Sequence, residues 1–298
     1  MALDAPRVKI ALNGVVVAPH SLVGMARAAE ELGYESIWSG EHIALGMDVD
    51  LSRYGDDPPY GPRSIFLEPF AMLAHLAAAT STLRLGIGIL ILPLHDPVAT
   101  AKRVATVDVL SGGRLDLGIG VGWNEPEFAN VGATWARRGA RTDEMIEVMD
   151  VLFRDDEPEF HGEFFAFPPV GFEPKPVQKP RPPIHVGGYG PAAWRRAVHR
   201  GDGWYGHGSP EEVAPTVERL RADRVAAGLD LDRFEVSLIR LDLPPDAEEI
   251  ERYAAAGVDR LVITPFEDRG RPPKIGTVGD EGLVGLRAYA ERIGLAPG

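Results

Sequence analysis

SGGRLDLGIGVGWNEPE, residues 111–127, contains the signals of a turn, a strand, a glycine-rich bend and a helix start. Gly112 and Gly113 predict the end of a preceding helix, because glycine adopts the left-handed backbone conformation at little steric cost. The LDLGI run that follows alternates apolar and other residues, which is typical of a β-strand. Asn124 can cap a helix, and Glu127 completes a capping-box pattern. The stretch therefore predicts a strand–loop–helix unit.

The bend inside this unit is a candidate ligand site. Gly120 and Gly122 have no side chains, so a ligand could approach the backbone closely. Free N–H groups at a helix start also attract an anion or the polar oxygens of a cofactor. An ordinary strand-to-helix turn has the same glycine pattern, so the local sequence leaves both interpretations open.

On both sides of this stretch the same strand-then-helix unit recurs. Apolar runs predict strands at residues 8–12, 35–39, 83–92, 115–119, 184–186, 203–205, 234–241 and 260–263. Helices are predicted at residues 21–32, 68–80, 98–110, 141–153, 192–200, 211–227, 247–256 and 281–293, with a further helix start at Asn124. Alternating strands and helices indicate a parallel sheet with crossover helices. Eight units in 298 residues favour one (β/α)8 TIM-barrel domain over residues 1–298 rather than an open, doubly wound sheet.

Two segments interrupt the alternation and are expected to be insertions. Residues 40–64, after the second strand, are rich in glycine, proline and aspartate, and so long a loop is usually functional or mobile. Residues 157–183, before the fifth strand, begin with a predicted small hairpin at residues 160–164 and continue as a proline-rich extended run.

The composition excludes several classes of partner and chemistry. The net charge of -13 argues against nucleic acid or an anionic membrane as the main partner, but it leaves room for a phosphorylated cofactor. The chain has no cysteine, so disulfides, thiolate catalysis and zinc–thiolate sites are excluded, and we expect no metal site. No apolar run is long enough for a signal peptide core or a transmembrane helix. We therefore expect a cytoplasmic protein.

A barrel of this type has its active site at the carboxyl ends of its strands, so the residues that follow each strand are the candidates. After the second strand, Glu41 precedes His42. A histidine beside a carboxylate can act as a general acid or base, because an imidazole titrates near neutral pH. The alternative is a loop histidine that is bonded to the backbone.

Other strand ends carry weaker signals. Gly86 and Gly88 interrupt the third strand, which indicates a bulge, a close backbone approach or tight packing against a helix. The turn Gly187–Pro191 starts a helix and could hold phosphate on its N–H groups, although it lacks the P-loop lysine. A basic cluster after the eighth strand could meet an anionic substrate or be simply solvated. Its members are Arg269, Arg271 and Lys274.

Seven segments together carry a family pattern. They are GYESIWSGEHI (33–43), LRLGIGILILPLHDP (83–97), DVLSGGRLDLGIGVGWNEPEF (108–128), RGARTDEMIEVM (138–149), FHGEFFAF (160–167), EPKPVQ (173–178) and PPIHVGGYGPAAWRRAVHRGDGW (182–204). In this order they resemble the luciferase-like monooxygenase superfamily, and most closely its deazaflavin branch, the oxidoreductases that depend on coenzyme F-420.

The resemblance implies a (β/α)8 barrel with the cofactor in its mouth. His42 matches a histidine near the reactive ring carbon, which protonates or deprotonates the substrate. Glu41 stands where those enzymes often carry aspartate, and we include it as a catalytic candidate. Gly88 and Ile89 match a bulge, often with a non-proline cis peptide, that presses on the back of the ring.

The resemblance also assigns the remaining cofactor contacts. Together with Gly120, the loop after the fourth strand is expected to lie beside the ring and the ribityl chain. The matching residues are Gly122, Trp123, Asn124 and Glu125. The turn after the fifth strand is expected to hold the ribityl or phosphate end. Its residues are Gly187, Gly188, Tyr189, Gly190 and Pro191.

The function implied by the resemblance is hydride transfer between coenzyme F-420 and a small organic substrate. Two alternatives stay open. One is a monooxygenase that uses oxygen and reduced flavin mononucleotide (FMNH2), the latter supplied by a partner reductase. The other is a protein that binds a flavin (FMN) or deazaflavin without turnover. The substrate is expected to contact residues 45–64 and 264–276, and a homodimer is expected because dimers are common in the superfamily.

Overall fold

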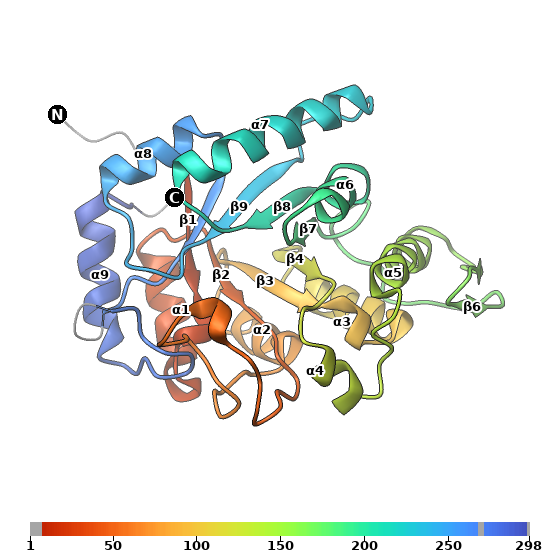
Figure 1. Cartoon of the computed structure of the whole chain (residues 1–298), viewed down its shortest axis with the longest axis horizontal. Coiled ribbons are helices and arrows are strands. Elements are labelled where there is room, and N and C mark those ends of the chain that lie inside the picture. Colours follow the sequence, from red (N-terminus) through yellow and green to blue (C-terminus); the bar gives the residue numbers. More distant parts are fainter. Residues whose placement is uncertain (1–7, 268–270, 297–298) are drawn as a thin grey trace.

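The computed structural model describes residues 8–267 and 271–296, and its centre is a closed barrel of parallel strands (Figure 1). The strands follow the order β1-β10-β9-β8-β7-β4-β3-β2 around the barrel. Their bounds are β1 Lys9–Asn13, β2 Ser36–Ser39, β3 Arg84–Ile91, β4 Leu115–Gly120, β7 Ile184–Gly187, β8 Gly203–Gly206, β9 Glu235–Ile239 and β10 Arg260–Ile263. The predicted (β/α)8 barrel is therefore confirmed.

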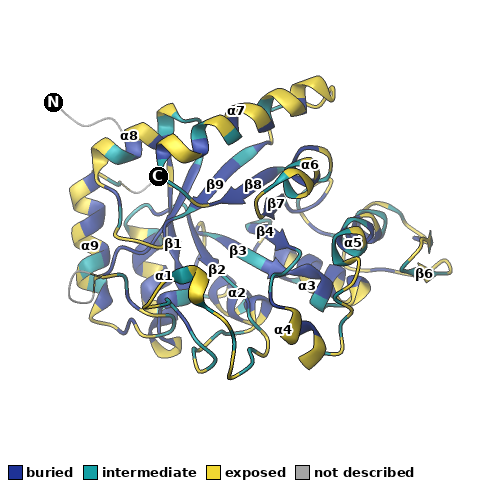
Figure 2. Ribbon diagram, in the orientation of Figure 1, coloured by how far each residue is buried: buried dark blue, intermediate teal, exposed yellow. Residues whose placement is uncertain are grey.

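Helices surround the barrel and bury their apolar faces against it, so that exposed residues lie on the outer side of the molecule (Figure 2). Their bounds are α1 Leu22–Glu31, α2 Pro69–Ala77, α3 Pro97–Leu110, α4 Glu125–Asn130, α5 Arg138–Arg154, α6 Pro191–Arg200, α7 Pro210–Ala226, α8 Ala247–Ala255 and α9 Gly282–Ile293. Among the residues that the structure describes, no helix is long and apolar enough to cross a membrane.

The barrel interior has an aromatic layer near the carboxyl ends of the strands. Trp38 of β2 and Tyr205 of β8 stack there, with ring centroids 5.2 Å apart, and form one buried cluster with Ala11 and Val262. A Cβ atom on Gly86 of β3 would overlap the Trp38 ring. The glycine that interrupts the third strand therefore makes room for an interior side chain and not for a neighbouring helix.

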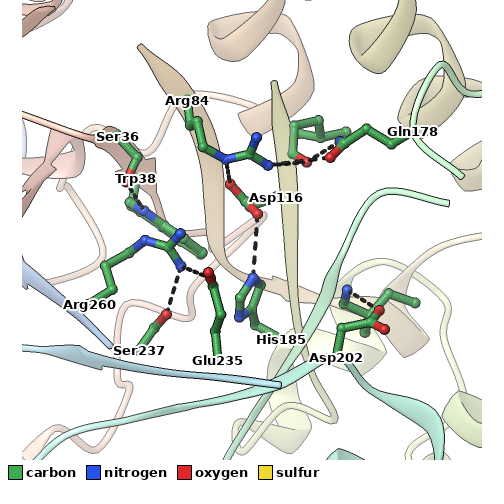
Figure 3. A network of polar contacts seen from close by, with 12 residues as sticks. Ser36, Trp38, Arg84, Asp116, Gln178, His185, Asp202, Glu235, Ser237 and Arg260 are labelled. Atoms are coloured by element: carbon green, nitrogen blue, oxygen red, sulfur yellow. Dashed lines mark hydrogen bonds and ion pairs between the residues drawn. The ribbon is translucent and has the colours of Figure 1, made fainter. Parts of the chain in front are cut away.

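A polar layer fills the interior beneath the aromatic one (Figure 3). Arg260 is buried and bonds to Glu35 at 2.8 Å and to Glu235 at 2.9 Å. Asp116 is buried and accepts a hydrogen bond from Nε of Arg84 at 2.7 Å. Burial favours the neutral carboxyl, but contacts with His185, Arg260 and Arg84 outweigh it and hold the pKa of Asp116 well below its usual range. Asp116 is therefore an ionised, buried partner of this layer.

The two predicted insertions are anchored to the barrel in different ways. In the second, β5 (Phe160–His161) and β6 (Ala166–Phe167) pair antiparallel, which confirms the predicted hairpin. Glu144 of α5 accepts hydrogen bonds from the backbone N–H groups of residues 163, 164 and 165 at 2.9, 2.8 and 2.8 Å, and so fixes the hairpin turn.

In the first insertion, residues 40–64, the short 3-10 helix η3 (Ser52–Tyr54) is the one regular element. Asp57 accepts a hydrogen bond from Lys274 at 2.8 Å and pairs with Arg271 at 3.4 Å. The N–H of Ile275 donates to the carbonyl of Pro59 at 3.2 Å. These contacts bind the loop after β2 to the loop after β10. Arg271 and Lys274 are thus partners of Asp57, while Arg269 lies outside the described residues.

Candidate active site

The candidate residues lie within or just after four adjacent strands. His42 lies after β2, Ile89 in β3, Gly120 at the end of β4 and Gly187 at the end of β7. These strands are neighbours in the barrel order, and parallel strands place their carboxyl ends at one edge. The structure therefore brings the predicted site residues together on one side of the barrel mouth.

His42 is held in a box of aromatic rings and one carboxylate. Its Nδ1 lies 2.9 Å from Oε2 of Glu127, and its Nε2 lies 3.3 Å from the hydroxyl of Tyr60. The rings of Tyr60, Phe66 and Trp123 surround the imidazole at centroid distances of 5.1, 5.0 and 6.1 Å. Both ring nitrogens of His42 therefore contact side chains, so the alternative of a histidine bonded to the backbone is wrong.

Glu127 has a different partner from the one that the sequence indicated. The predicted capping box is wrong, because the side chain of Asn124 makes no cap bond and Glu127 turns toward the loop after β2. Its Oε1 accepts hydrogen bonds from the N–H groups of Ile43 and Ala44, at 2.7 and 3.3 Å. Glu127 thus fixes both the imidazole and the backbone that carries it.

The charge state of Glu127 follows from these bonds. Burial favours the neutral acid, but the bonds from His42, Ile43 and Ala44 outweigh it and lower the pKa of Glu127 below its usual value. An ionised carboxylate can only accept hydrogen bonds. Nδ1 of His42 is therefore the donor of this pair.

Glu41 is not the carboxylate beside His42, and this expectation is corrected. Its side chain points to β3, where Oε2 accepts the N–H of Ile91 at 2.8 Å. Nε2 of His95 lies 2.9 Å from Oε1. Glu41 is buried and so joins the ends of β2 and β3. The polar contacts of the Glu41 and His42 side chains do not include one another.

The third strand contains the predicted bulge. Its register with β4 shifts between Ile87 and Leu90, and the Gly88–Ile89 peptide is cis. A Cβ atom on Gly120 would overlap Cδ1 of Ile89, and a Cβ atom on Gly187 would lie 2.9 Å from the same atom. The Ile89 side chain therefore occupies the space above both glycines, and their role toward a cofactor stays a prediction.

The loop after β4 presents an unusual side-chain amide. Asn124 is buried, and its Nδ2 has no hydrogen-bond partner in the described part of the chain. Trp123 before it forms part of the box around His42, and Glu125 after it is exposed. Gly122 has φ 76, a conformation that favours glycine.

The turn after β7 is open on its outer side. The carbonyl of Gly188 accepts a hydrogen bond from Nε1 of Trp204 at 2.9 Å. Tyr189 is half exposed, and its hydroxyl donates to the carbonyl of His207. Gly190 caps α6 and has no atom within 4 Å of the position of a Cβ, and Pro191 is the first residue of the helix. The start of α6 is therefore accessible to a ligand.

The sequence predicted that the substrate contacts residues 45–64, but it did not single out individual residues of the loop after β2. The guanidinium carbon of Arg53 lies 4.9 Å from the centre of the Trp123 ring. Tyr60 and Phe66 belong to the same wall of the mouth. These residues carry no periodic or motif signal, since the tertiary contacts of the loop alone determine their positions.

A cavity of about 420 Å³ lies beside the site, between the ends of β8 and β9. Ile239, Arg240 and His207 line it, and the His207 ring lies 4.7 Å from the ring of Tyr189 in the turn after β7. Burial lowers the pKa of His207, Glu212 opposes this effect, and Arg53 adds to it.

Proteins of known sequence are similar to this chain over most of its length. The family described as luciferase-like monooxygenase matches residues 4–281. An uncharacterized protein of Mycobacterium tuberculosis is 38% identical over 255 residues, which is 83% of this chain and 81% of that protein. The oxygenase component of a flavin-dependent trigonelline monooxygenase from Acinetobacter baylyi is 30% identical over 245 residues, which is 78% of this chain and 61% of that protein.

A solved structure with a similar fold is an F420-dependent secondary alcohol dehydrogenase in complex with an F420-acetone adduct. The two chains superpose with a TM-score of 0.75 and 18% sequence identity, over 97% of this chain and 99% of the other. At this identity the likeness concerns the fold. The match of the family pattern over nearly the whole sequence carries the assignment: the chain belongs to the luciferase-like monooxygenase family.

Proposed function

We propose that the protein is an oxidoreductase that uses coenzyme F-420 and transfers hydride between this deazaflavin and a small organic substrate. The observation that carries the proposal is the position of His42, which Glu127 holds on the same side of the barrel mouth as the Gly88–Ile89 bulge. The fold of the F420-dependent secondary alcohol dehydrogenase supports it. Secondary alcohols are therefore the first substrate class to test.

The residues at the mouth fit a cofactor of this kind. The Ile89 side chain gives the mouth an apolar support for a planar ring. Nδ2 of Asn124 is a buried donor without a partner in the described part of the chain, and a cofactor oxygen would satisfy it. Open space beside Gly190 gives an anionic group access to the N–H groups at the start of α6.

The side chains of the box would carry the proton that accompanies the hydride. A bound deazaflavin supplies the ring carbon that exchanges hydride with the substrate. Because Glu127 accepts the Nδ1–H of His42, the lone pair of Nε2 is held ready to take a proton from a substrate hydroxyl. Phe66 and Trp123 pack against the imidazole and exclude water from it.

A second candidate is a monooxygenase that uses FMNH2 and oxygen with a partner reductase. The 30% identity to the oxygenase component of the flavin-dependent trigonelline monooxygenase favours it. A flavin has an oxygen-reactive nitrogen where the deazaflavin has carbon. Cofactor binding and oxygen uptake therefore separate the two candidates.

The first experiment is a fluorescence titration of the purified protein with oxidised coenzyme F-420 and, separately, with FMN. Binding of F-420 in preference to FMN, followed by its reduction with a secondary alcohol, supports the proposal. Preference for FMN with oxygen uptake from FMNH2 supports the second candidate. Binding without turnover of any alcohol or hydride acceptor would contradict both and indicate a binding protein.

Matched histidine variants test the role of His42. We expect His42→Ala to lower kcat roughly 100-fold, within the usual range for a general acid or base. His20→Ala, which removes an exposed imidazole elsewhere, leaves kcat unchanged. Near-normal turnover by the His42→Ala protein would contradict the role of His42.

A further inference from the structure

The imidazole of His42 is enclosed on almost every side. Its side chain is 9% exposed. The Nδ1–H is bonded to Glu127, and the edges or faces of Phe66 and Trp123 close off the ring. A buried base that accepts a proton in every turnover has to release it before the next one. His42 therefore needs a path for protons from its box to the solvent.

The one polar contact of Nε2 in the described part of the chain begins such a path. Nε2 lies 3.3 Å from the hydroxyl of Tyr60, and this hydroxyl donates to the hydroxyl of Tyr54 at 3.0 Å. Tyr60 is 8% exposed, whereas Tyr54 is half-buried on η3 next to the exposed Arg53. The two hydroxyls thus connect a buried imidazole with the surface of the loop after β2.

We propose that Tyr60 and Tyr54 form a proton relay that connects Nε2 of His42 with solvent during turnover. The inference rests on the proposed function, since it requires His42 to accept and release a proton. The two tyrosines lie in the loop after β2, which carries no recognisable family pattern.

The relay balances in protons and electrons. In alcohol oxidation the substrate O–H bond breaks and an Nε2–H bond forms, while the electron pair of the C–H bond leaves with its hydrogen as hydride, for which the oxidised deazaflavin of the proposed function is the acceptor. The Nε2 proton then passes to the oxygen of Tyr60, the proton of Tyr60 passes to the oxygen of Tyr54, and the proton of Tyr54 passes to water. In ketone reduction the same protons move in the opposite direction.

The hydroxyls of Tyr60 and Tyr54 act as neutral groups in this relay. Burial raises the pKa of Tyr60 above the usual tyrosine value, the bond to Tyr54 raises it further, and the charge of Arg53 lowers it by a smaller amount. Tyr60 therefore keeps its proton at neutral pH, and it relays by accepting one proton as it donates another. Because Tyr60 donates its proton to Tyr54, Nε2 can bond to the Tyr60 oxygen, 3.3 Å away, once Nε2 carries the proton taken from the substrate.

The first test uses the protein without cofactor. NMR of protein labelled with 15N-histidine measures how fast the Nε2–H proton of His42 exchanges with solvent. We expect Tyr60→Phe and Tyr54→Phe to slow this exchange roughly 100-fold, the low end of the usual effects of proton-transfer groups. Tyr34→Phe is the matched control, because the Tyr34 hydroxyl is buried and bonds to the carbonyl of Leu286, away from the site. Equal exchange rates in all four proteins would overturn the relay.

The second test uses the enzyme with coenzyme F-420 and alcohol. Either phenylalanine variant lowers kcat, leaves the cofactor dissociation constant unchanged, and regains turnover when imidazole is added as a small proton carrier. Unchanged kcat in both variants would overturn the relay and leave the proposed function standing. Slower His42 exchange in a protein that shows no F-420 turnover would support the proton path and overturn the proposed function. Because Tyr54 is only half-buried, the Tyr54→Phe variant still provides the test if the Tyr60→Phe protein fails to fold.

Discussion

The carboxylate of Glu127 and the imidazole of His42 lie 2.9 Å apart, although the residues are 85 positions apart in the chain. One oxygen of the carboxylate bonds to the ring and the other to the backbone N–H groups of Ile43 and Ala44. Glu127 is 1% exposed and ionised. The first turn of α4 therefore determines how the residue after β2 faces the barrel mouth.

Replacement of Glu127 by glutamine should reduce turnover without unfolding the protein. The amide keeps the size of the side chain but loses the charge that binds three donors at once. We expect Glu127→Gln to lower kcat about 10- to 100-fold, as for outer groups that orient a functional histidine. Glu218→Gln, on the exposed side of α7, is the control and should leave kcat unchanged. A kcat of the Glu127→Gln protein equal to that of wild type would show that the pair does not orient His42.

Removal of the Asp116 charge should destabilise the barrel. The carboxylate is buried, bonds to Arg84 and lies close to His185 and Arg260, so Asp116→Asn removes one of the buried anions that balance these two arginines. We expect the free energy of unfolding to fall by about 3–5 kcal/mol at pH 7, measured by urea denaturation. Asp156→Asn, at an exposed position, is the control.

We also expect the stability difference between wild type and Asp116→Asn to depend on pH. The folded-state pKa of Asp116 is lower than the unfolded-state value of about 3.9. The ionised carboxylate therefore stabilises the fold above that value, and its contribution is lost as the pH falls through the folded-state pKa. The difference in unfolding free energy between wild type and Asp116→Asn should be constant above about pH 5 and shrink below about pH 4. A difference that grows in acid would contradict an ionised Asp116.

Two glycines of β4 should respond differently to an added methyl group. A Cβ atom at residue 118 would overlap the backbone carbonyl of Ile87, whereas at residue 120 it would overlap the flexible end of the Ile89 side chain. We expect Gly118→Ala to cost about 3 kcal/mol of stability and Gly120→Ala about 1 kcal/mol. Gly120→Ala should in turn weaken cofactor binding, because Ile89 has to move. Equal stability losses in thermal or urea unfolding would contradict the bulge geometry.

The position of Arg53 can be tested without turnover. Its charge lowers the pKa of His207, together with the larger effect of burial. Arg53→Gln should therefore raise the pKa of His207, as measured by NMR titration of the histidine signals. Arg63→Gln, an exposed arginine of the same loop, is the matched control and should have no effect. An unchanged His207 titration in the Arg53→Gln protein would contradict an effect of the Arg53 charge on His207.

The fold could be predicted from the sequence because it depends on local, periodic signals. The apolar run of β3 and the alternation in β4 determine which faces are buried, and eight such units allow few arrangements. The hairpin at residues 160–167 and the bulge at Gly88–Ile89 were predictable for the same reason, since glycine and turn residues mark them.

The partners of the site residues could not be predicted in the same way. Glu127 stands three positions after Asn124, and a capping box explains this spacing as well as a bond to a distant histidine does. Tyr54 and Tyr60 lie in a segment without periodicity, and their contacts depend on how the loop folds over the mouth. Side-chain partners across different strand ends are therefore the part of the site that needed the structure.

The contacts of Asp57 with Arg271 and Lys274, and of Pro59 with Ile275, have a consequence for how this enzyme could acquire a new specificity. A chimera that received residues 40–64 from a relative would place a foreign loop against native residues 271–278, with mismatched charges and backbone bonds. Exchange of both segments in one step keeps these contacts matched. Loop shuffling in this scaffold should therefore treat the two segments as a single inherited unit.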